Sequence, residues 1–192
     1  DVDVENGMFK ERCEIEVDNS SYVIASSDGK TLYSIADEGV VSFRILPNGS
    51  LARLNSAPIR GMRGCHLCTD EEDKYVFVSG YHDGKTTVLS LNPDGSVGKI
   101  VDGVFDRGYG SVAERNFRPH VTCTRRMPDN RFVLSVDNGI DQVKIYRFND
   151  KEQRLVQVDA IRCELESAPR HFRYSKDGKF IYLMYELKKA ID

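Results

Sequence analysis

The fold is decided by a pattern that is clearest near the end of the chain, in residues 170–182, which read RHFRYSKDGKFIY. A short apolar run meets an acidic turn at Asp177-Gly178, a lysine follows the turn, and a second apolar run begins. Two β-type runs joined by Asp-Gly favour a hairpin, because these residues accept the positive φ that tight hairpin turns require. Residues 170–182 therefore predict two antiparallel strands.

The same pattern occurs three more times along the chain. Residues 21–33 read SYVIASSDGKTLY, residues 65–77 read CHLCTDEEDKYVF, and residues 122–134 read TCTRRMPDNRFVL. The basic residues that follow the four turns, Lys30, Lys74, Arg131 and Lys179, are separated by 44, 57 and 48 residues. A second hairpin follows in each of the first three repeats. Each of these repeats therefore predicts four strands.

Four strands per repeat, a period in the forties and no convincing amphipathic helix predict an all-β protein, a β-propeller of four-stranded antiparallel blades. A β-sandwich would give similar strands, but its strands need not recur as four-stranded units with matching turns. The predicted blades span residues 19–55, 64–101, 118–163 and 169–192, the last of them incomplete. An unclosed ring exposes a sheet edge, so we expect about four blades of one longer propeller domain.

Composition excludes several classes of protein. The 192 residues carry 27 Lys and Arg against 30 Asp and Glu, so the net charge of −3 offers no global attraction for nucleic acid or anionic lipid. The longest apolar run, residues 180–185, is far shorter than the roughly 20 residues of a membrane span. Five Cys and no recognisable leader peptide favour reduced thiols, and we expect a cytoplasmic protein with no nucleic-acid or membrane partner.

Polar residues converge at one end of the predicted blades. Residues equally far from a hairpin turn become neighbours, so Arg170 should meet Glu186, and His120 should lie near residues 137–140. The inner strands start at the same mouth of the central channel, where a concave site with imidazoles and opposed charges is expected. The residues that we expect to bind substrate there are His66, His82, Arg107, Glu114, Arg115, Asp137 and His171.

Each of these residues also has a purely structural interpretation. An Arg and a Glu paired across a hairpin are commonly a stabilising ion pair. His66 and His171 occupy equivalent repeat positions, which favours a shared structural task, whereas His120 breaks the pattern and is the better candidate for chemistry. Cys65 and Cys68 face opposite sides of a strand, so they cannot chelate one metal ion together, and we expect no metal site.

The interval of 57 residues contains an insertion between Val101 and Arg118. A long polar loop that contains glycines is a usual place for a pocket lid. A tolerated surface loop is an equally good interpretation.

Several of these motifs resemble a known family. Gly64-Cys65-His66-Leu67, Arg118-Pro119-His120, Pro169-Arg170-His171-Phe172 and Tyr185-Glu186-Leu187 are similar to motifs of the seven-bladed lactonase family, which includes 6-phosphogluconolactonases and 3-carboxy-cis,cis-muconate lactonizing enzymes. The resemblance implies a seven-bladed ring and a cytoplasmic, metal-independent enzyme without a cofactor, which acts on a small anionic lactone or carboxylate. It also implies His120, Arg170 and Glu186 as the catalytic residues.

Three functions remain open at the level of sequence. In lactone hydrolysis His120 would activate water, Arg170 would bind an anionic group or the oxyanion, and Glu186 would orient Arg170 or carry a proton. In the reverse sense the same residues would serve a muconate cycloisomerase. Bacterial lactonases of this family often have a second His where this chain has Thr122. A non-catalytic interaction scaffold is the third possibility, although the chain has no Trp and hence no Trp-Asp repeat.

Overall fold

The computed structural model describes residues 2–111 and 117–192, and this part of the chain contains strands and no helix. The strands of the N-terminal hairpin and of the first sheet are β1 (Val2–Asp3), β2 (Met8–Phe9), β3 (Val23–Ala25), β4 (Thr31–Ile35), β5 (Gly39–Ile45) and β6 (Leu51–Pro58). The second sheet contains β7 (His66–Thr69), β8 (Tyr75–Gly80), β9 (Lys85–Leu91) and β10 (Val97–Phe105). The remaining strands are β11 (Val121–Arg126), β12 (Val133–Asp137), β13 (Gln142–Asn149), β14 (Arg154–Arg162), β15 (Pro169–Tyr174) and β16 (Ile181–Tyr185). Among the described residues, no helix has the length and apolar character needed to cross a membrane.

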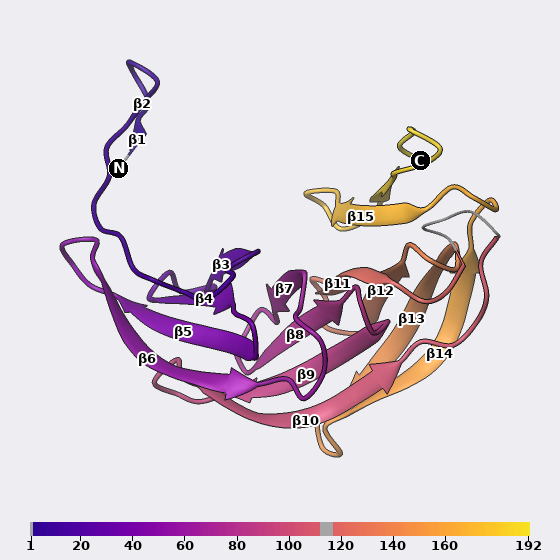
Figure 1. Cartoon of the computed structure of the whole chain (residues 1–192), viewed down its shortest axis with the longest axis horizontal. Helices are drawn as coiled ribbons and strands as arrows, with labels where there is room; N and C mark the ends of the chain where they lie inside the picture. The colour runs from indigo at the N-terminus through magenta and orange to yellow at the C-terminus, as the bar shows by residue number, and fades with distance from the viewer. Residues whose placement is uncertain (1, 112–116) are drawn as a thin grey trace.

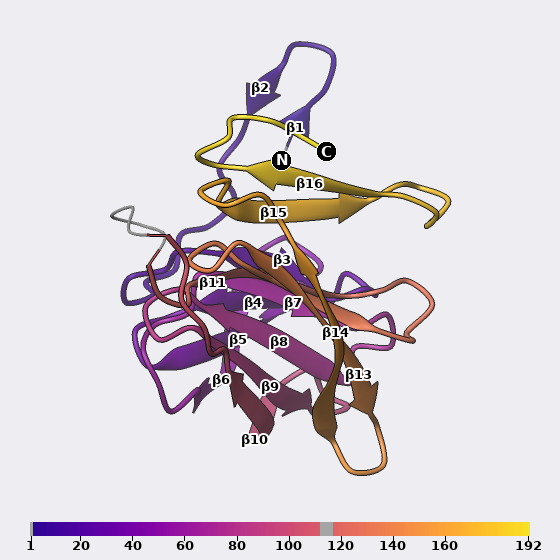
Figure 2. The same cartoon turned by 90° about the vertical axis from the view of Figure 1, so that its right-hand side faces the viewer.

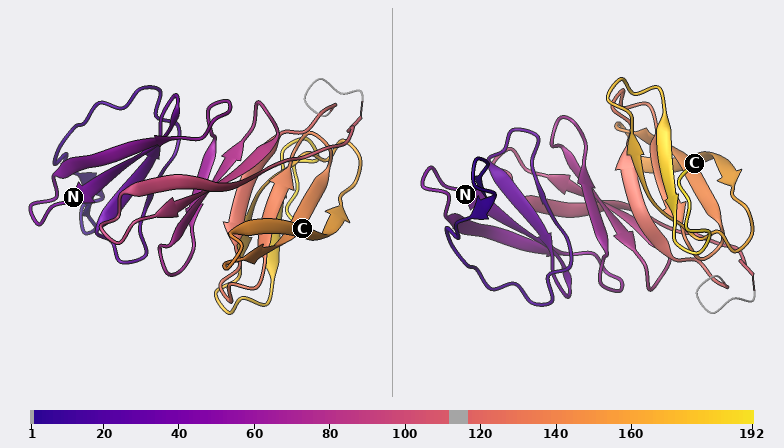
Figure 3. Two further views of the ribbon diagram at one scale, coloured as in Figure 1. Left: turned by 90° about the horizontal axis from the view of Figure 1, so that it is seen from below. Right: turned by 90° about the horizontal axis from the view of Figure 1, so that it is seen from above.

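The larger sheets are antiparallel meanders in which strands adjacent in sequence are adjacent in space. Strands β3 to β6, β7 to β10 and β11 to β14 form three four-stranded sheets, and β15 pairs with β16. The sheets follow one another along a crescent, and the first strand of each sheet lies on the concave side (Figure 1). Seen from above and below, the three complete sheets stand side by side, each twisted relative to the next (Figure 3). These are the blades of a partial propeller, as the repeats predict.

The tight turns between the first two strands of each sheet explain why the repeats fold alike. The residue before each aligned basic residue has a positive φ, namely Gly29, Asp73, Asn130 and Gly178 at 69°, 50°, 58° and 70°. A nearby aspartate in each turn accepts the backbone N–H of the basic residue, as Asp177 does from Lys179 at 3.2 Å. The acidic turn therefore stabilises the left-handed residue that reverses the chain.

The apolar cores lie between neighbouring blades. Tyr33 and Ile35 of the first blade pack with Leu67 and Val78 of the second. A second cluster joins the second and third blades, and a third joins the third blade to Phe172 of β15. Burying each such side chain contributes about 1.5–3 kcal/mol, so each blade is stabilised mainly by its neighbours.

Buried hydroxyl groups join the second and third blades within this packing. Ser79 Oγ donates to Thr124 Oγ1 at 3.0 Å, and Thr86 Oγ1 lies 3.0 Å from Ser135 Oγ. Thr124 Oγ1 also lies 3.1 Å from Ser135 Oγ. The four hydroxyls can satisfy one another's hydrogen bonds, which makes their burial tolerable.

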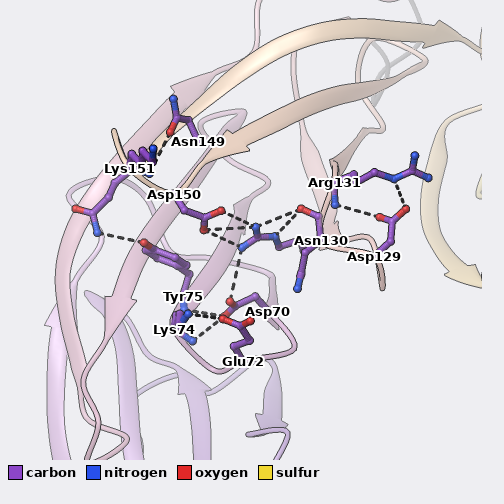
Figure 4. A network of polar contacts seen from close by, with 12 residues as sticks. Asp70, Glu72, Lys74, Tyr75, Asp129, Asn130, Arg131, Asn149, Asp150 and Lys151 are labelled. Atoms are coloured by element: carbon purple, nitrogen blue, oxygen red, sulfur yellow. Dashed lines mark hydrogen bonds and ion pairs between the residues drawn. The ribbon is translucent and has the colours of Figure 1, made fainter.

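The two ends of the channel differ in the residues they carry. We call the end where β7, β11 and β15 begin the mouth, and the end where their first hairpin turns lie the turn end. At the turn end Arg126 Nη1 lies 3.6 Å from Asp70 Oδ2 of the second blade, and its Nη2 lies 3.1 Å from Asp150 Oδ2. Figure 4 shows this network around the labelled Asp70, Asn130 and Asp150. Nearby, Gln153 Nε2 donates to Tyr75 Oη at 3.3 Å. Opposite charges therefore join the blades at the turn end.

The long insertion differs from the sequence-based expectation in its first part. Residues 101–105 belong to β10, which pairs with β9, so the connection to the third blade begins only at Asp106. The first part of the expected insertion is therefore strand rather than lid. The last hairpin, β15 and β16, follows the third sheet, and its strand β15 contacts β11 and β12 (Figure 1 and Figure 2).

Candidate active site

The mouth contains a cavity of about 410 Å³ lined by Cys65, Tyr81, His82, Thr122, Arg170 and His171. Cys65, Thr122 and Arg170 stand nine positions before the aligned basic residue of their repeats, so the fold repeats one position around the channel. In β11 and β15 this position falls at a register shift, between Val121 and Cys123 and between Pro169 and His171. A bulge re-aims a side chain, which explains why Thr122 and Arg170 face the cavity.

Arg170 and Glu186 form an ion pair, as their equal distance from the hairpin turn predicts. The guanidinium Nη1 of Arg170 donates to Oε2 of Glu186. The side chains are 42% and 24% exposed, so the pair remains open to a ligand. The Arg170 carbonyl accepts a hydrogen bond from Thr122 Oγ1 at 2.7 Å, which ties the bulge to the third blade. The guanidinium is therefore held at the cavity wall.

His120 lies beside this cavity rather than in its wall. Its ring stacks on the ring of Tyr81 with centroids 4.3 Å apart, and Tyr81 lines the cavity. Nδ1 lies 2.6 Å from the Tyr81 carbonyl oxygen. A carbonyl can only accept, so Nδ1 carries the proton and Nε2 keeps its lone pair. No described residue forms a hydrogen bond with Nε2.

Burial lowers the pKa of His120, and the charges of Arg118 and His82 lower it further, against the opposing hydrogen bond to Tyr81. Burial likewise lowers the pKa of His171, helped by the charge of Arg170. Both imidazoles are therefore neutral at pH 7 and can accept a proton. Burial raises the pKa of Cys65 to about 12, which keeps this cavity thiol protonated and unreactive.

The sequence predicts that His66 binds substrate, but the structure buries His66 outside the cavity lining. His66 is 0% exposed, and Arg125 Nη2 lies 3.1 Å from its Nε2. The Tyr22 ring lies 4.7 Å away and the His171 ring 6.0 Å away, between centroids. Burial and the charge of Arg125 lower the pKa of His66 to about 3. His66 is therefore a neutral packing residue of the channel wall.

Asp137 is likewise buried, although the sequence predicts that it binds substrate. It is 0% exposed, and its Oδ1 accepts the backbone N–H groups of His120 and Gly139 at 2.8 and 2.9 Å. It therefore acts behind the site and not on a ligand.

The remaining predicted residues are divided between the cavity and its surroundings. His82 and His171 line the cavity. Arg107 is exposed and is not among the lining residues. Glu114 and Arg115 lie outside the described residues.

Two site residues escape the sequence-based reasoning. Tyr81 falls within residues 80–82, which the hairpin rule places opposite Cys65, so its aromatic ring was a usable signal. Asp106 carries no such signal, because it approaches Asp137 from another blade. Within residues 2–111 and 117–192, no group of three or more His, Cys, Asp or Glu side chains is arranged to hold a metal ion. Cys65 and Cys68 are free thiols.

Comparison with known proteins agrees with the fold and the motifs. The family model of the seven-bladed β-propeller lactonases matches residues 1–192, and the chain belongs to this family. The 6-phosphogluconolactonase of Bacillus subtilis is 31% identical over 178 residues, which cover 90% of this chain and 50% of that protein. The chain thus spans about half the length of the curated relatives it matches.

Solved structures give the same result. A putative 6-phosphogluconolactonase from Bacteroides fragilis is 29% identical and superposes with a TM-score of 0.88, over 100% of this chain and 60% of that one. The periplasmic gluconolactonase of Pseudomonas aeruginosa shares the fold, with 24% identity and a TM-score of 0.90, over 99% of this chain and 57% of that one. These relatives are lactonases by name, so they favour neither the cycloisomerase nor the scaffold alternative.

Proposed function

We propose that this chain carries the hydrolytic site of a lactonase whose substrate is a small anionic lactone, of the class of 6-phosphogluconolactone. The observation that carries the proposal is the position of the Arg170 guanidinium, which Glu186 fixes at the wall of the cavity. The imidazoles of His82 and His171 line the same cavity. A guanidinium held in this way suits a phosphate, a carboxylate or a developing oxyanion. The Bacillus subtilis relative supports the sugar-phosphate class.

His120 is the proposed general base. Its neutral imidazole keeps Nε2 free of bonds to described residues, while the Tyr81 carbonyl fixes the proton on Nδ1. In the proposed reaction Nε2 takes a proton from water as the water oxygen bonds to the lactone carbonyl carbon. The C–O bond of the ring then breaks, and the leaving alkoxide takes that proton back from the imidazolium. The products are the hydroxy acid and the unchanged enzyme.

Arg170 is proposed to stabilise negative charge on the substrate. The carbonyl oxygen becomes an oxyanion when water adds, and a pre-oriented donor stabilises that charge without further reorganisation. Glu186 is the orienting partner, since it bonds the guanidinium and leaves the rest of it open to the cavity. The pair thus has a structural and a catalytic use at once.

The remainder of the ring is proposed to come from further blades of the same protein. Phe180 and Tyr182 on the last hairpin are 62% and 52% exposed, and in the described chain the far edge of β16 pairs only with the short segment of residues 190–192. Strands that continue this sheet would cover both. They would also close the channel around the cavity.

Hydrolysis of 6-phosphogluconolactone, followed as acid release and corrected for the spontaneous reaction, tests the proposal. Arg170→Ala should lower kcat by about 100- to 1000-fold, which is the usual loss for one oxyanion donor. The matched control is Arg162→Ala, because Arg162 is exposed at the end of the outer strand β14. Turnover by Arg170→Ala at the level of the control would defeat the assignment, as would no acceleration by the native protein.

A further inference from the structure

Three consecutive residues at the end of β12, Asp137, Asn138 and Gly139, form what we call the corner. Asp137 Oδ1 accepts the backbone N–H of His120 at 2.8 Å, and the Asn138 N–H donates to the His120 carbonyl at 2.9 Å. The corner therefore holds the backbone of His120 on both its N–H and its C=O side. The backbone of His120 can therefore move only if the corner moves with it.

The other side of the corner contacts the Arg170–Glu186 pair. Asn138 Nδ2 lies 3.2 Å from Glu186 Oε2 and 3.5 Å from the Ala168 carbonyl. Asn138 is 1% exposed, so its amide contacts the partly exposed Glu186 from the buried side. The corner thus joins the third blade's histidine to the ion pair of the fourth.

Gly139 shows how closely the corner packs. A Cβ at this position would lie 1.7 Å from the Arg118 carbonyl oxygen and 2.8 Å from His120 Cδ2. Only glycine permits this approach. The corner is consequently seated directly against the residues on either side of Pro119.

Asp106, the residue that follows β10 of the second blade, supports the corner from behind. Its Oδ1 accepts the hydroxyl of Tyr146 at 2.9 Å. The carboxyl groups of Asp106 and Asp137 lie close enough that each affects the pKa of the other. The Oδ2 atoms of Asp106 and Asp137 are buried, and neither receives a donor from a described residue. Two carboxyl groups in this arrangement are stable when they share one proton.

The surroundings favour the retention of that proton. Burial, followed by the charge of Asp106, raises the pKa of Asp137 to about 8. The groups that face the pair are the Tyr146 hydroxyl, the Lys144 ammonium and the backbone N–H groups of His120 and Gly139. Lys144 opposes the rise at Asp106, but burial of Asp106 is the larger effect. At pH 7 the pair therefore holds one proton.

We propose that the corner is the positioning element of the candidate active site, and that Asp106 holds it in place from the neighbouring blade by sharing a proton with Asp137. The inference rests on the proposed function for its effect on turnover. Loss of the shared proton would leave two negative charges facing each other in a buried place. Asp137 would then turn away from its partner and release the N–H of His120.

Asp106→Asn tests this arrangement. The amide Nδ2 of the new side chain can donate to Asp137 Oδ2, and its oxygen can still accept from Tyr146, so no shared proton is needed. In the native protein kcat should fall above pH 8 by about tenfold per pH unit. In Asp106→Asn this alkaline loss should be absent. An alkaline loss of the same size in both proteins overturns the proposal.

Two further measurements do not depend on turnover, and they separate this proposal from the proposed function. The His120 imidazole resonance, in protein labelled at its histidines, should shift between pH 7 and 9.5 in the native protein and stay constant in Asp106→Asn. The melting temperature should fall less between pH 6 and 9 in Asp106→Asn than in the native protein. Equal shifts and equal falls in the two proteins overturn the proposal even if no lactone is hydrolysed.

Two variants guard against a misleading result. Asp159→Asn, at an exposed carboxylate of β14, should behave like the native protein throughout. If Asp106→Asn fails to fold, Asp137→Asn takes its place, since its amide can donate to Asp106 and its oxygen can still accept from His120 and Gly139. Failure of both variants to fold overturns the proposal, because either amide supplies the hydrogen that the shared proton supplies.

Discussion

At the turn end of the junction between the second and third blades, Arg126 lies between Asp70 and Asp150, whereas at the mouth two carboxyl groups, Asp106 and Asp137, face each other. Both sets of side chains join the same two blades. At the turn end the partners have opposite charges, and Asp70 Oδ1 also accepts two backbone N–H groups. At the mouth both partners are carboxyl groups, and their contact depends on the proton that we propose they share.

The difference shows that the less stable of the two contacts lies at the mouth, beside the candidate active site. An opposite-charge contact needs no shared proton, and it places no restriction on the site at the far end of the channel. A carboxyl pair is less stable on its own, but Asp137 Oδ1 accepts the backbone N–H groups of His120 and Gly139, and its buried Oδ2 is left for the proton that we propose it shares with Asp106. Such locally unfavourable contacts are typical of functional sites. We therefore expect changes at the mouth to affect turnover, and changes at the turn end to affect stability.

The largest combined effect, on turnover and stability together, is expected from Gly139→Ala at the mouth. The new Cβ has no room beside the Arg118 carbonyl, so the corner must move. We expect about 3 kcal/mol less free energy of unfolding, as for overpacked sites, together with loss of turnover. Urea unfolding and lactone hydrolysis measure the two effects. Gly103→Ala is the control, because a Cβ there would lie 3.0 Å from the Lys85 side chain and 3.8 Å from the nearest backbone atom, the Thr86 carbonyl oxygen. Equal behaviour of the two variants would show that the corner is not tightly seated.

Arg126→Met should lower stability by a similar amount without changing turnover per folded molecule. The Arg126 and Asp70 side chains are 6% and 2% exposed, and removing one partner of such a pair costs about 3–5 kcal/mol. Burial raises the pKa of Asp70, against the pull of its hydrogen bonds and of Arg126, and without Arg126 it should rise further. A raised carboxyl pKa means that stability is lost as pH increases.

The loss in Arg126→Met should therefore be larger at pH 8 than at pH 4, which denaturant titrations at both values would show. The control is Arg131→Met, since Arg131 pairs with Asp129 on the surface and should contribute nothing measurable. A changed pH dependence of turnover in Arg126→Met would contradict the separation of the two ends.

Asn138→Asp should have the smallest effect, and it sharpens the comparison by adding a like charge at the mouth. The new carboxylate would lie close to Glu186, compete for Arg170 and reduce kcat by about tenfold at pH 8, or about 1.4 kcal/mol. Protonation at pH 5 should restore part of the loss. Asn138→Ala removes the hydrogen bond without adding a charge, so its kcat relative to the native protein should not depend on pH. Identical pH profiles for the two variants would refute the electrostatic explanation.

Much of the fold is predictable from the sequence because hairpin turns are local. The positive φ of Gly178 and of its equivalents, and the aspartates that accept turn N–H groups, are encoded within about five residues. Once a turn is fixed, the register follows by counting. This is why the contacts of Arg170 with Glu186, and of His120 with Asp137, follow from residue numbers.

Counting within a hairpin also has limits. It places His66 at the mouth, but burial beneath Tyr22 and Arg125 removes it from the cavity, because side chains of neighbouring inner strands cover it. It gives the neighbours of a residue along the sheet, and it does not show which side chains reach the cavity.

The sequence by itself determined the repeats, the hairpins, the family and which polar residues gather at one mouth. Only the tertiary structure decided that Asp106 faces Asp137, that Asn138 reaches Glu186 and that the bulges turn Thr122 and Arg170 toward the cavity. The first set depends on backbone preferences and pairing over a few residues. The second depends on how each blade is rotated against the next, which is set by the packing of all the side chains between them.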